Sequence, residues 1–135
     1  MNLSSKTVSS LKLLIDLGEN YQSGEFISLN DISRRKDLSK KFLEQIVPFL
    51  KQSGLIIGNR GTQGGYKLNK KPSEITLKEI LLLTENGFEK ANANSQAIDS
   101  VMNTLDVIIN NYLTMTTLQD LVDKEVDSYS NSYII

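Results

Sequence analysis

The pattern of apolar and polar residues predicts a chain of helices interrupted by one pair of short strands. Leu11, Leu14 and Ile15 fall on one face of a first helix. This helix is expected from about residue 5 to residue 17, with Gly18 as a candidate for its end. The polar residues that follow predict a loop.

A second and a third helix are expected after this loop. Ser28 is placed to cap the second helix, which extends to residue 34 or 35, with Asp31 reaching back to the cap. Ser39 caps the third helix, because its hydroxyl can accept a bond from an unpaired backbone N–H group. Gly54 ends that helix. Its buried stripe is Leu43, Ile46, Val47 and Leu50.

Two short apolar strands around a glycine-containing loop follow the third helix. The strands are residues 55–57 and 66–68, and Gly61, Gly64 and Gly65 are expected to supply permissive backbone angles at the tip. A helix followed by such a hairpin is a winged helix, which is a way of reading DNA.

The last part of the chain is again helical. Thr76 and Glu79 fit a capping box that starts a helix ending near residue 83. Residues 85–96 are polar and predict a loop. The apolar residues of the next helix, residues 97–113, are Ile98, Val101, Met102, Leu105, Ile108, Ile109 and Tyr112. Steps of 3, 4, 3 and 4 residues from Ile98 to Tyr112 match a heptad seam.

A short last helix is expected to begin near Thr117, and the polar tail after it ends in an apolar tripeptide, residues 133–135. The predicted fold is mainly α with a small β-hairpin wing, which is an α+β class. Residues 1–84 are expected to form a winged helix-turn-helix DNA-binding domain. A loop at 85–96 would lead to a dimerisation helix, a short helix and a tail at 97–135.

The composition excludes several kinds of site. The chain has neither cysteine nor histidine, which argues against a zinc, copper or iron–sulfur centre and against a thiol or histidine catalyst. No phosphate-binding loop or paired carboxylates support an enzyme. Because these residue types are missing, we expect no cofactor. The N-terminus lacks the apolar run of a signal peptide, so we expect a cytoplasmic protein.

Charge is divided unequally along the chain although the formal net charge is only −1. Residues 1–72 contain 12 Lys and Arg against 6 Asp and Glu, whereas residues 73–135 contain 3 against 10. Such asymmetry favours a nucleic-acid-binding face on the basic part. The acidic part would limit non-specific DNA affinity, since that affinity is mostly phosphate electrostatics.

Five segments of the sequence resemble the Rrf family of bacterial winged-helix regulators, whose members include IscR, NsrR and CymR. They are LSSK (3–6), FLEQI (42–46), SGLI (53–56), NRGTQGGYKL (59–68) and EITLKEIL (74–81). The resemblance is strongest up to about residue 84, and TTLQDLV (116–122) continues it. It implies a DNA-binding transcription regulator, expected to be a repressor, that acts as a homodimer on a palindromic operator.

The sequence also departs from the family pattern. Members with an iron–sulfur cluster hold it with cysteines in the loop that corresponds to 85–97, and this chain has none there. The usual Arg-Tyr after the opening Lys is Val8-Ser9, and the usual Pro-Gly at the wing tip is Thr62-Gln63. Cluster sensing is therefore not implied, and the wing geometry can differ.

The candidate DNA-binding residues lie at the start of the third helix, in the hairpin and at two flanking positions. Lys40 and Lys41 are suited to phosphates at a helix N-terminus, and Glu44 can accept a bond from cytosine. Arg60 is suited to a narrow minor groove. The full set is Lys6, Ser28, Ser39, Lys40, Lys41, Phe42, Glu44, Gln45, Arg60, Gly61, Thr62, Gln63 and Lys67. The alternative for Lys40 and Lys41 is a solvated pair, and for Glu44 it is a helix-capping or salt-bridging role. For Arg60 the alternative is contact with one phosphate or with none.

Two further interactions are left open by the sequence. The heptad seam either pairs two copies, which we favour, or packs within its own chain. The apolar C-terminus either packs on the dimer or is captured by a partner protein. The CymR branch of the family partners cysteine synthase, so the alternative function is a protein-interaction regulator whose tail or winged helix binds such a partner.

Overall fold

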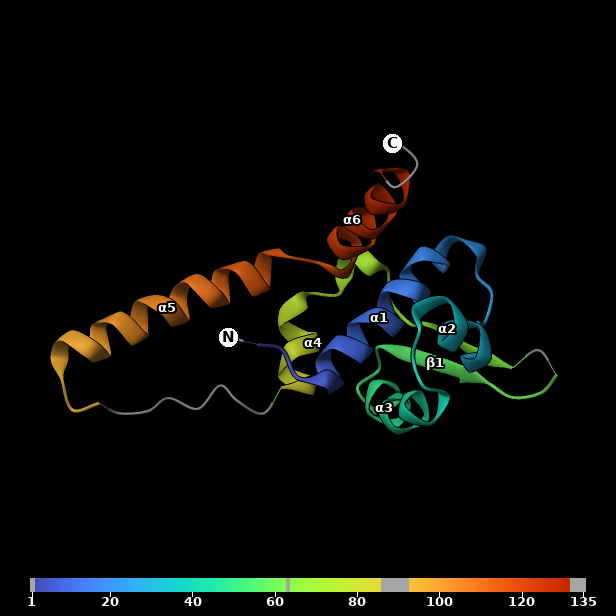
Figure 1. The fold of residues 1–135 in the computed structure, drawn as a ribbon, viewed down its shortest axis with the longest axis horizontal. Coiled ribbons are helices and arrows are strands. Elements are labelled where there is room, and N and C mark those ends of the chain that lie inside the picture. The colour runs from blue at the N-terminus through green and yellow to red at the C-terminus, as the bar shows by residue number, and fades with distance from the viewer. Residues whose placement is uncertain (1, 63, 86–92, 132–135) are drawn as a thin grey trace.

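The computed structural model describes residues 2–62, 64–85 and 93–131 (Figure 1). Two antiparallel strands and several helices make up these residues. In chain order the elements are α1 (Ser5–Glu19), η1 (Tyr21–Ser23), α2 (Leu29–Lys36), α3 (Lys40–Gln52), β1 (Ile56–Asn59), β2 (Gly65–Leu68), η2 (Pro72–Glu74), α4 (Leu77–Thr84), α5 (Gln96–Met115) and α6 (Leu118–Asn131). This confirms the predicted fold class of helices with one hairpin.

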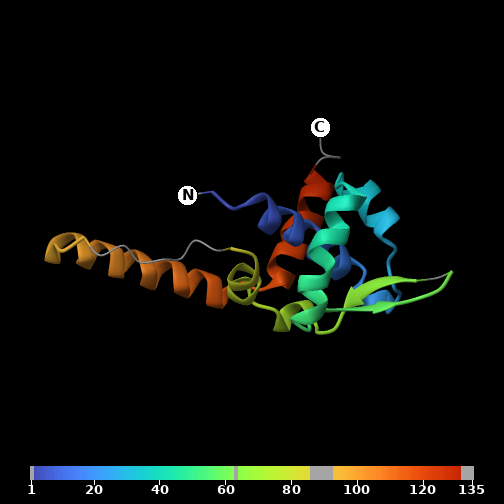
Figure 2. The ribbon, with the colours of Figure 1, turned by 90° about the horizontal axis from the view of Figure 1, so that it is seen from below.

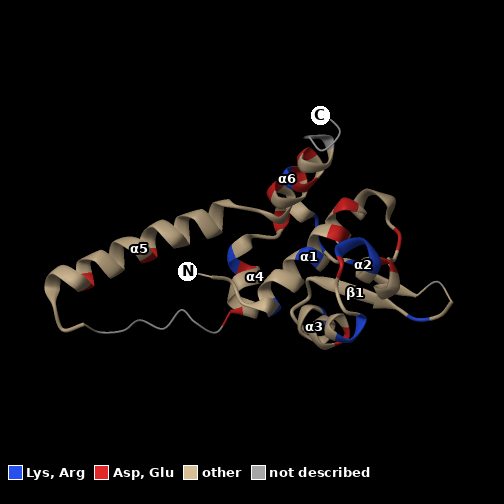
Figure 3. Ribbon diagram, viewed as in Figure 1, with Lys and Arg blue, Asp and Glu red and all other residues tan. Residues whose placement is uncertain are grey.

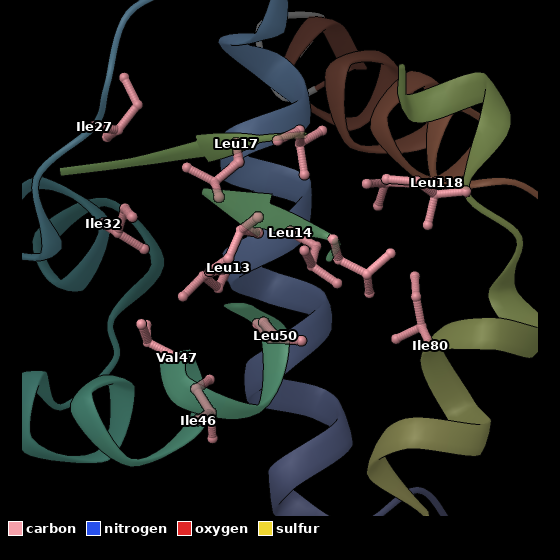
Figure 4. Close-up of a cluster of buried hydrophobic side chains, with 14 of the residues drawn as sticks. Leu13, Leu14, Leu17, Ile27, Ile32, Ile46, Val47, Leu50, Ile80 and Leu118 are labelled. Carbon is pink, nitrogen blue, oxygen red and sulfur yellow. The ribbon is translucent and has the colours of Figure 1, made fainter. Parts of the chain in front are cut away.

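Helix α1 is the central element of the body, and α2, α3, β2, α4 and α6 all contact it. Its residues Leu13, Leu14 and Leu17 are almost completely buried among side chains from the surrounding elements (Figure 4). Burying one such leucine stabilises the fold by about 1.5–3 kcal/mol. The predicted stripe of α3 joins the same core, so α3 is fixed directly against α1.

Most of the predicted helix caps are present. The Ser39 hydroxyl accepts a bond from the Phe42 backbone N–H at 3.1 Å. Both halves of the Thr76–Glu79 capping box form. At α2 the Ser28 hydroxyl caps the helix, but the Asp31 carboxylate bonds Arg34 at 2.8 Å. The expectation that Asp31 reaches back to Ser28 was therefore wrong, because a guanidinium one turn further along competes for the carboxylate.

Two predicted helix ends had different outcomes. Gly54, just after α3, has a φ of +83°, as expected for a glycine that ends a helix. Gly18 does not end α1, which continues to Glu19. A Cβ at Gly18 would lie 2.6 Å from Val122 Cγ2. The small residue is required there because α6 packs closely against α1.

Helix α6 is part of the main body rather than an appendage. Leu118 and Val122 are buried in the same core as α1. The Leu118 backbone N–H donates to the Ile75 carbonyl at 2.8 Å, and the Leu77 N–H donates to the Thr116 carbonyl at 2.8 Å. The sequence predicted a short last helix, but α6 has 14 residues and includes the start of the predicted tail. The remaining tail, residues 132–135, lies outside the described residues.

Helix α5 projects away from the body in both views (Figures 1 and 2). It has 20 residues, of which only Leu113 is buried. Most of the predicted loop before it, residues 86–92, lies outside the described part of the chain. No helix of the described residues is both long and apolar enough to cross a membrane.

Candidate nucleic-acid interface

The first two turns of α3 carry the largest group of predicted contact residues. Lys40, Lys41, Glu44 and Gln45 are all exposed. They lie away from the buried stripe that fixes α3 to α1, so the packing of the helix leaves this group facing outward. Phe42 is different, since its side chain is half-buried and packs against the core.

Glu44 lies at the edge of a groove between α3 and the base of the hairpin. The groove is also lined by Leu29, Val47, Pro48, Lys51, Gln52 and Tyr66. No ion pair involves Glu44 in the described part of the chain. Its carboxylate is therefore available to a ligand beside the helix, as base reading requires.

The hairpin is antiparallel, and its pairing extends from Ile56 opposite Leu68 to Asn59 opposite Gly65. Compared with the prediction, β1 begins one residue later and ends two residues later, while β2 begins one residue earlier and ends as predicted. Arg60, Gly61 and Thr62 follow the last pair and are exposed at the tip. Gln63 is not among the described residues. The wing projects on the side of the molecule away from α5 (Figure 2).

The glycines of the hairpin have two different roles. Gly61 has a φ of +120°, a backbone angle that residues with a side chain rarely adopt. Gly65 lacks a positive φ, so the prediction of permissive angles was wrong for this residue. A Cβ at Gly65 would lie 2.4 Å from the Ile27 carbonyl oxygen, and one at Gly64 would lie 2.7 Å from that of Asn59. Close backbone approach is what requires glycine there.

Ile27 attaches the loop before α2 to the hairpin, a contact that sequence reasoning missed. Its N–H donates to the Tyr66 carbonyl and its carbonyl accepts from the Tyr66 N–H, both at 2.8 Å. Ser28 follows directly, so the cap of α2 lies beside the wing. One hollow is lined by Ser28, Asn59, Thr62 and Gly64 together with Glu25, Phe26 and Asp31. Two consecutive glycines, Gly64 and Gly65, are the sequence signal that could have indicated a close backbone contact here.

Lys67 and Lys6 are each held against an aromatic ring. The Lys67 ammonium lies 4.6 Å from the centroid of the Phe26 ring and donates to the Gly24 carbonyl at 3.4 Å. It therefore points to the loop before α2. The Lys6 ammonium lies 3.7 Å from the centroid of the Phe49 ring on α3. These contacts place the Lys6 ammonium, but not that of Lys67, beside α3.

The basic residues of α2 are neutralised within the chain. Arg34 pairs with Asp31 at 2.8 Å and Arg35 with Asp16 at 3.0 Å. Lys36 pairs with Glu19 at 2.7 Å. Burial raises the pKa of Asp16, and Arg35 offsets only part of that effect. Arg35 and Lys36 hold α2 to α1, whereas the Arg34–Asp31 pair lies within α2 at the surface. All three cations already have a carboxylate partner, so they are less suited to a phosphate-binding surface than unpaired ones.

Lys40, Lys41 and Arg60 form no ion pair among the described residues. The start of α3 and the wing lie on the same side of the body, while acidic residues are prominent on α6 (Figure 3). The basic excess of the N-terminal half is thus left uncompensated mainly on α3 and the wing. Such a surface attracts a polyanion.

The predicted seam of α5 is exposed in the single chain. Ile98, Val101, Leu105, Ile108 and Tyr112 are each at least 50% exposed, whereas Met102 and Ile109 are half-buried. Val107 and Met115 are also exposed and were not predicted. An apolar groove of about 750 Å³ continues from the seam, lined mainly by Leu11, Leu77, Leu81, Ile109, Leu113 and Leu121.

The arrangement of α2, α3 and a hairpin with unpaired basic residues defines a winged-helix DNA-binding protein. The chain belongs to the Rrf2 family, described as iron-dependent transcriptional regulators, and the match spans residues 3–124. It is similar to the HTH-type transcriptional regulator CymR of Bacillus subtilis (strain 168), with 30% identity over 96% of this chain and 97% of CymR. The family and CymR are described as transcription regulators and not as enzymes.

IscR of Cereibacter sphaeroides is 38% identical over a shorter stretch, which covers 63% of this chain and 56% of IscR. Solved structures agree with these matches. The structure of B. subtilis CymR superposes with a TM-score of 0.83 at 28% identity, covering 92% of this chain and 98% of that one. T. potens IscR superposes with a TM-score of 0.78 at 27% identity, covering 93% and 88%.

The iron dependence in the family description does not fit the donor groups of this chain. An iron–sulfur cluster is held by cysteine thiolates, with histidine in some centres, and the sequence contains neither residue. Among the described residues, no group of three or more Asp and Glu side chains could hold a metal ion. A cluster of the usual kind therefore cannot be built from its side chains.

Proposed function

We propose that this regulator is a homodimeric repressor that binds a palindromic operator without an iron–sulfur cluster. The observation that carries the proposal is the set of exposed, unpaired basic side chains on α3 and the wing, beside fully paired ones on α2. A cation whose charge is not compensated in the free protein can exchange its counterions for phosphates, which supplies much of DNA affinity.

Different residues of this surface would serve different parts of the duplex. Lys40 and Lys41 are proposed to contact backbone phosphates, and Glu44, with Gln45 beside it, to read bases in the major groove. Arg60 is proposed to enter the adjacent minor groove, where a narrow A/T tract concentrates negative potential. Ser28 and Thr62 share one hollow and would meet the backbone between these points.

The exposed seam of α5 supports dimerisation. A projecting helix with a continuous apolar stripe is a feature that monomers rarely leave uncovered. An isologous contact between two such helices would bury both stripes at once. The two recognition helices could then contact half-sites about one DNA turn, roughly 34 Å, apart.

Selection of bound fragments from genomic DNA, followed by sequencing, tests this function. The purified protein should enrich fragments that share an inverted repeat with half-sites about one helical turn apart. Promoter-proximal positions that overlap the transcription start would support repression. Recovery of fragments without a common motif would contradict sequence-specific binding.

A further inference from the structure

Phe49 is an exposed aromatic residue on the recognition helix that the proposed contacts do not use. The buried stripe of α3 does not include it, and 46% of its surface is exposed. Its ring instead supports the ammonium of Lys6 from the first turn of α1, with 3.7 Å between the nitrogen and the ring centroid. The pair therefore joins α1 to α3 at the surface.

The ring fixes the ammonium without neutralising it. A cation on the face of a ring is attracted by the ring quadrupole. The ring carries no net charge, so the N–H groups that point away from it remain available to other acceptors. Lys6 has no carboxylate partner in the described part of the chain. Lys36 shows the contrasting arrangement, since the Glu19 carboxylate and the Tyr129 hydroxyl both bond its ammonium.

The backbone at the start of α1 is fixed by other contacts. The Ser4 N–H donates to the Glu85 carboxylate at 2.7 Å, and the Thr7 hydroxyl donates to that of Thr84 at 2.8 Å. The hydrogen bond from the Ser4 backbone lowers the pKa of the Glu85 carboxyl. Because the Ser4 N–H is already paired with the Glu85 carboxylate, it is not available to a phosphate, whereas the Lys6 ammonium has no carboxylate partner among the described residues.

We propose that Phe49 is a positioning residue that holds the Lys6 ammonium beside the recognition helix for a backbone phosphate of the operator. This inference rests on the proposed DNA-binding function and deepens it. The ring restricts a long, flexible side chain before binding, so less conformational entropy is lost when the phosphate is contacted. The recognition helix thereby orients a phosphate contact that belongs to another helix.

Operator binding of four variants tests this assignment: Lys6→Ala, Phe49→Leu, the combination of both, and Phe49→Tyr. Lys6→Ala should weaken binding to all sequences alike and make the salt dependence shallower. Phe49→Leu should weaken binding about two- to fivefold, the size of a cation–π contact at an exposed site. Phe49→Tyr retains the ring and should bind like wild type. In the Lys6→Ala background, Phe49→Leu should have no further effect.

Several outcomes would overturn the proposal. If Phe49→Leu still weakens binding when Lys6 is absent, the ring contacts DNA itself or supports the fold, and it does not act through Lys6. Wild-type affinity of Phe49→Leu would also overturn it. Failure of the wild-type protein to bind operator would instead refute the proposed function. If Phe49→Leu does not fold, Phe49→Met can replace it in the same comparison, because methionine also lacks a ring and has a volume similar to that of leucine.

Discussion

Basic residues of this chain differ in what lies beside them, and this difference separates structural from DNA-contacting roles. Arg35 bonds the buried carboxylate of Asp16 through two nitrogens, so its charge is used to hold α2. Arg60 lies exposed at the wing tip without an ion pair among the described residues. Sequence composition cannot make this distinction, because pairing depends on residues far apart in the chain.

Replacing Arg60 by alanine should weaken operator binding by about 1–3 kcal/mol while the fold and the dimer stay intact. The loss is expected because a guanidinium in a narrow minor groove interacts with concentrated negative potential. Fluorescence anisotropy with labelled operator measures it. Arg34→Ala is the matched control, because it removes the same charge from a side chain already paired with Asp31. Equal affinities of the two variants would exclude the minor-groove role.

Replacing Glu44 by alanine should change base preference more than total affinity. A carboxylate costs affinity beside phosphates but can accept a bond from cytosine, so its removal relaxes discrimination at that base. Selection from a randomised operator library, followed by sequencing, measures the preference. A motif identical to that of the wild-type protein would show that Glu44 does not read a base.

At the scale of elements, local sequence signals predicted the helices and their caps well. Ser39, Thr76 and Gly54 act as expected because capping depends on neighbouring residues. The signals failed where a distant segment decides the conformation. Gly18 was interpreted as a helix end but makes room for α6, and Gly65 makes room for the Ile27 carbonyl.

Gly65→Ala should destabilise the winged helix by about 2–3 kcal/mol, since the added methyl group overlaps backbone atoms that cannot move independently. The expected contact distance to the Ile27 oxygen is only 2.4 Å. Urea denaturation followed by circular dichroism measures the change. Gly58→Ala is the control, because its nearest contact at 3.0 Å is the Tyr66 side chain, which can shift. Equal losses at both positions would contradict the assigned role of Gly65.

The sequence indicated candidate DNA-binding residues one by one but not how they are arranged in space. Sequence reasoning selected Lys40, Lys41 and Arg60 because helix start and hairpin tip are recognisable locally. It placed Lys67 in the same group, whereas the structure turns this ammonium toward Phe26. The Lys6–Phe49 pair was also missed, because nothing in either local segment indicates that α1 and α3 meet there.

At the scale of the whole molecule, the chain combines a basic reading surface with a projecting helix. The body buries its core around α1, whereas the apolar stripe of α5 remains exposed. This makes packing of the stripe within its own chain, the alternative left open by the sequence, difficult to reconcile with the structure of the described residues. We therefore expect the stripe to be covered by a second copy.

Replacing Val101 and Leu105 by glutamate should produce monomers, because four carboxylates would be brought together in the proposed dimer contact. Sedimentation velocity measures the oligomeric state, and binding to a full palindrome should fall in parallel. Asn103→Glu with Asn110→Glu is the control, since both residues are exposed on the opposite side of α5. A Val101/Leu105 variant that sediments as a wild-type dimer would show that this stripe does not form the interface.

The salt dependence of operator binding tests the central claim most directly. It should be compared between the wild-type protein and the Lys40→Ala/Lys41→Ala variant. Each lost phosphate contact reduces the slope of log K against log salt by about 0.9. A dimer that loses both lysines from each α3 should therefore have a slope shallower by roughly 3–4. Lys78→Ala/Lys124→Ala, on α4 and α6, should leave it nearly unchanged. Equal slopes for the two double variants would contradict the assignment of the DNA-binding surface to α3.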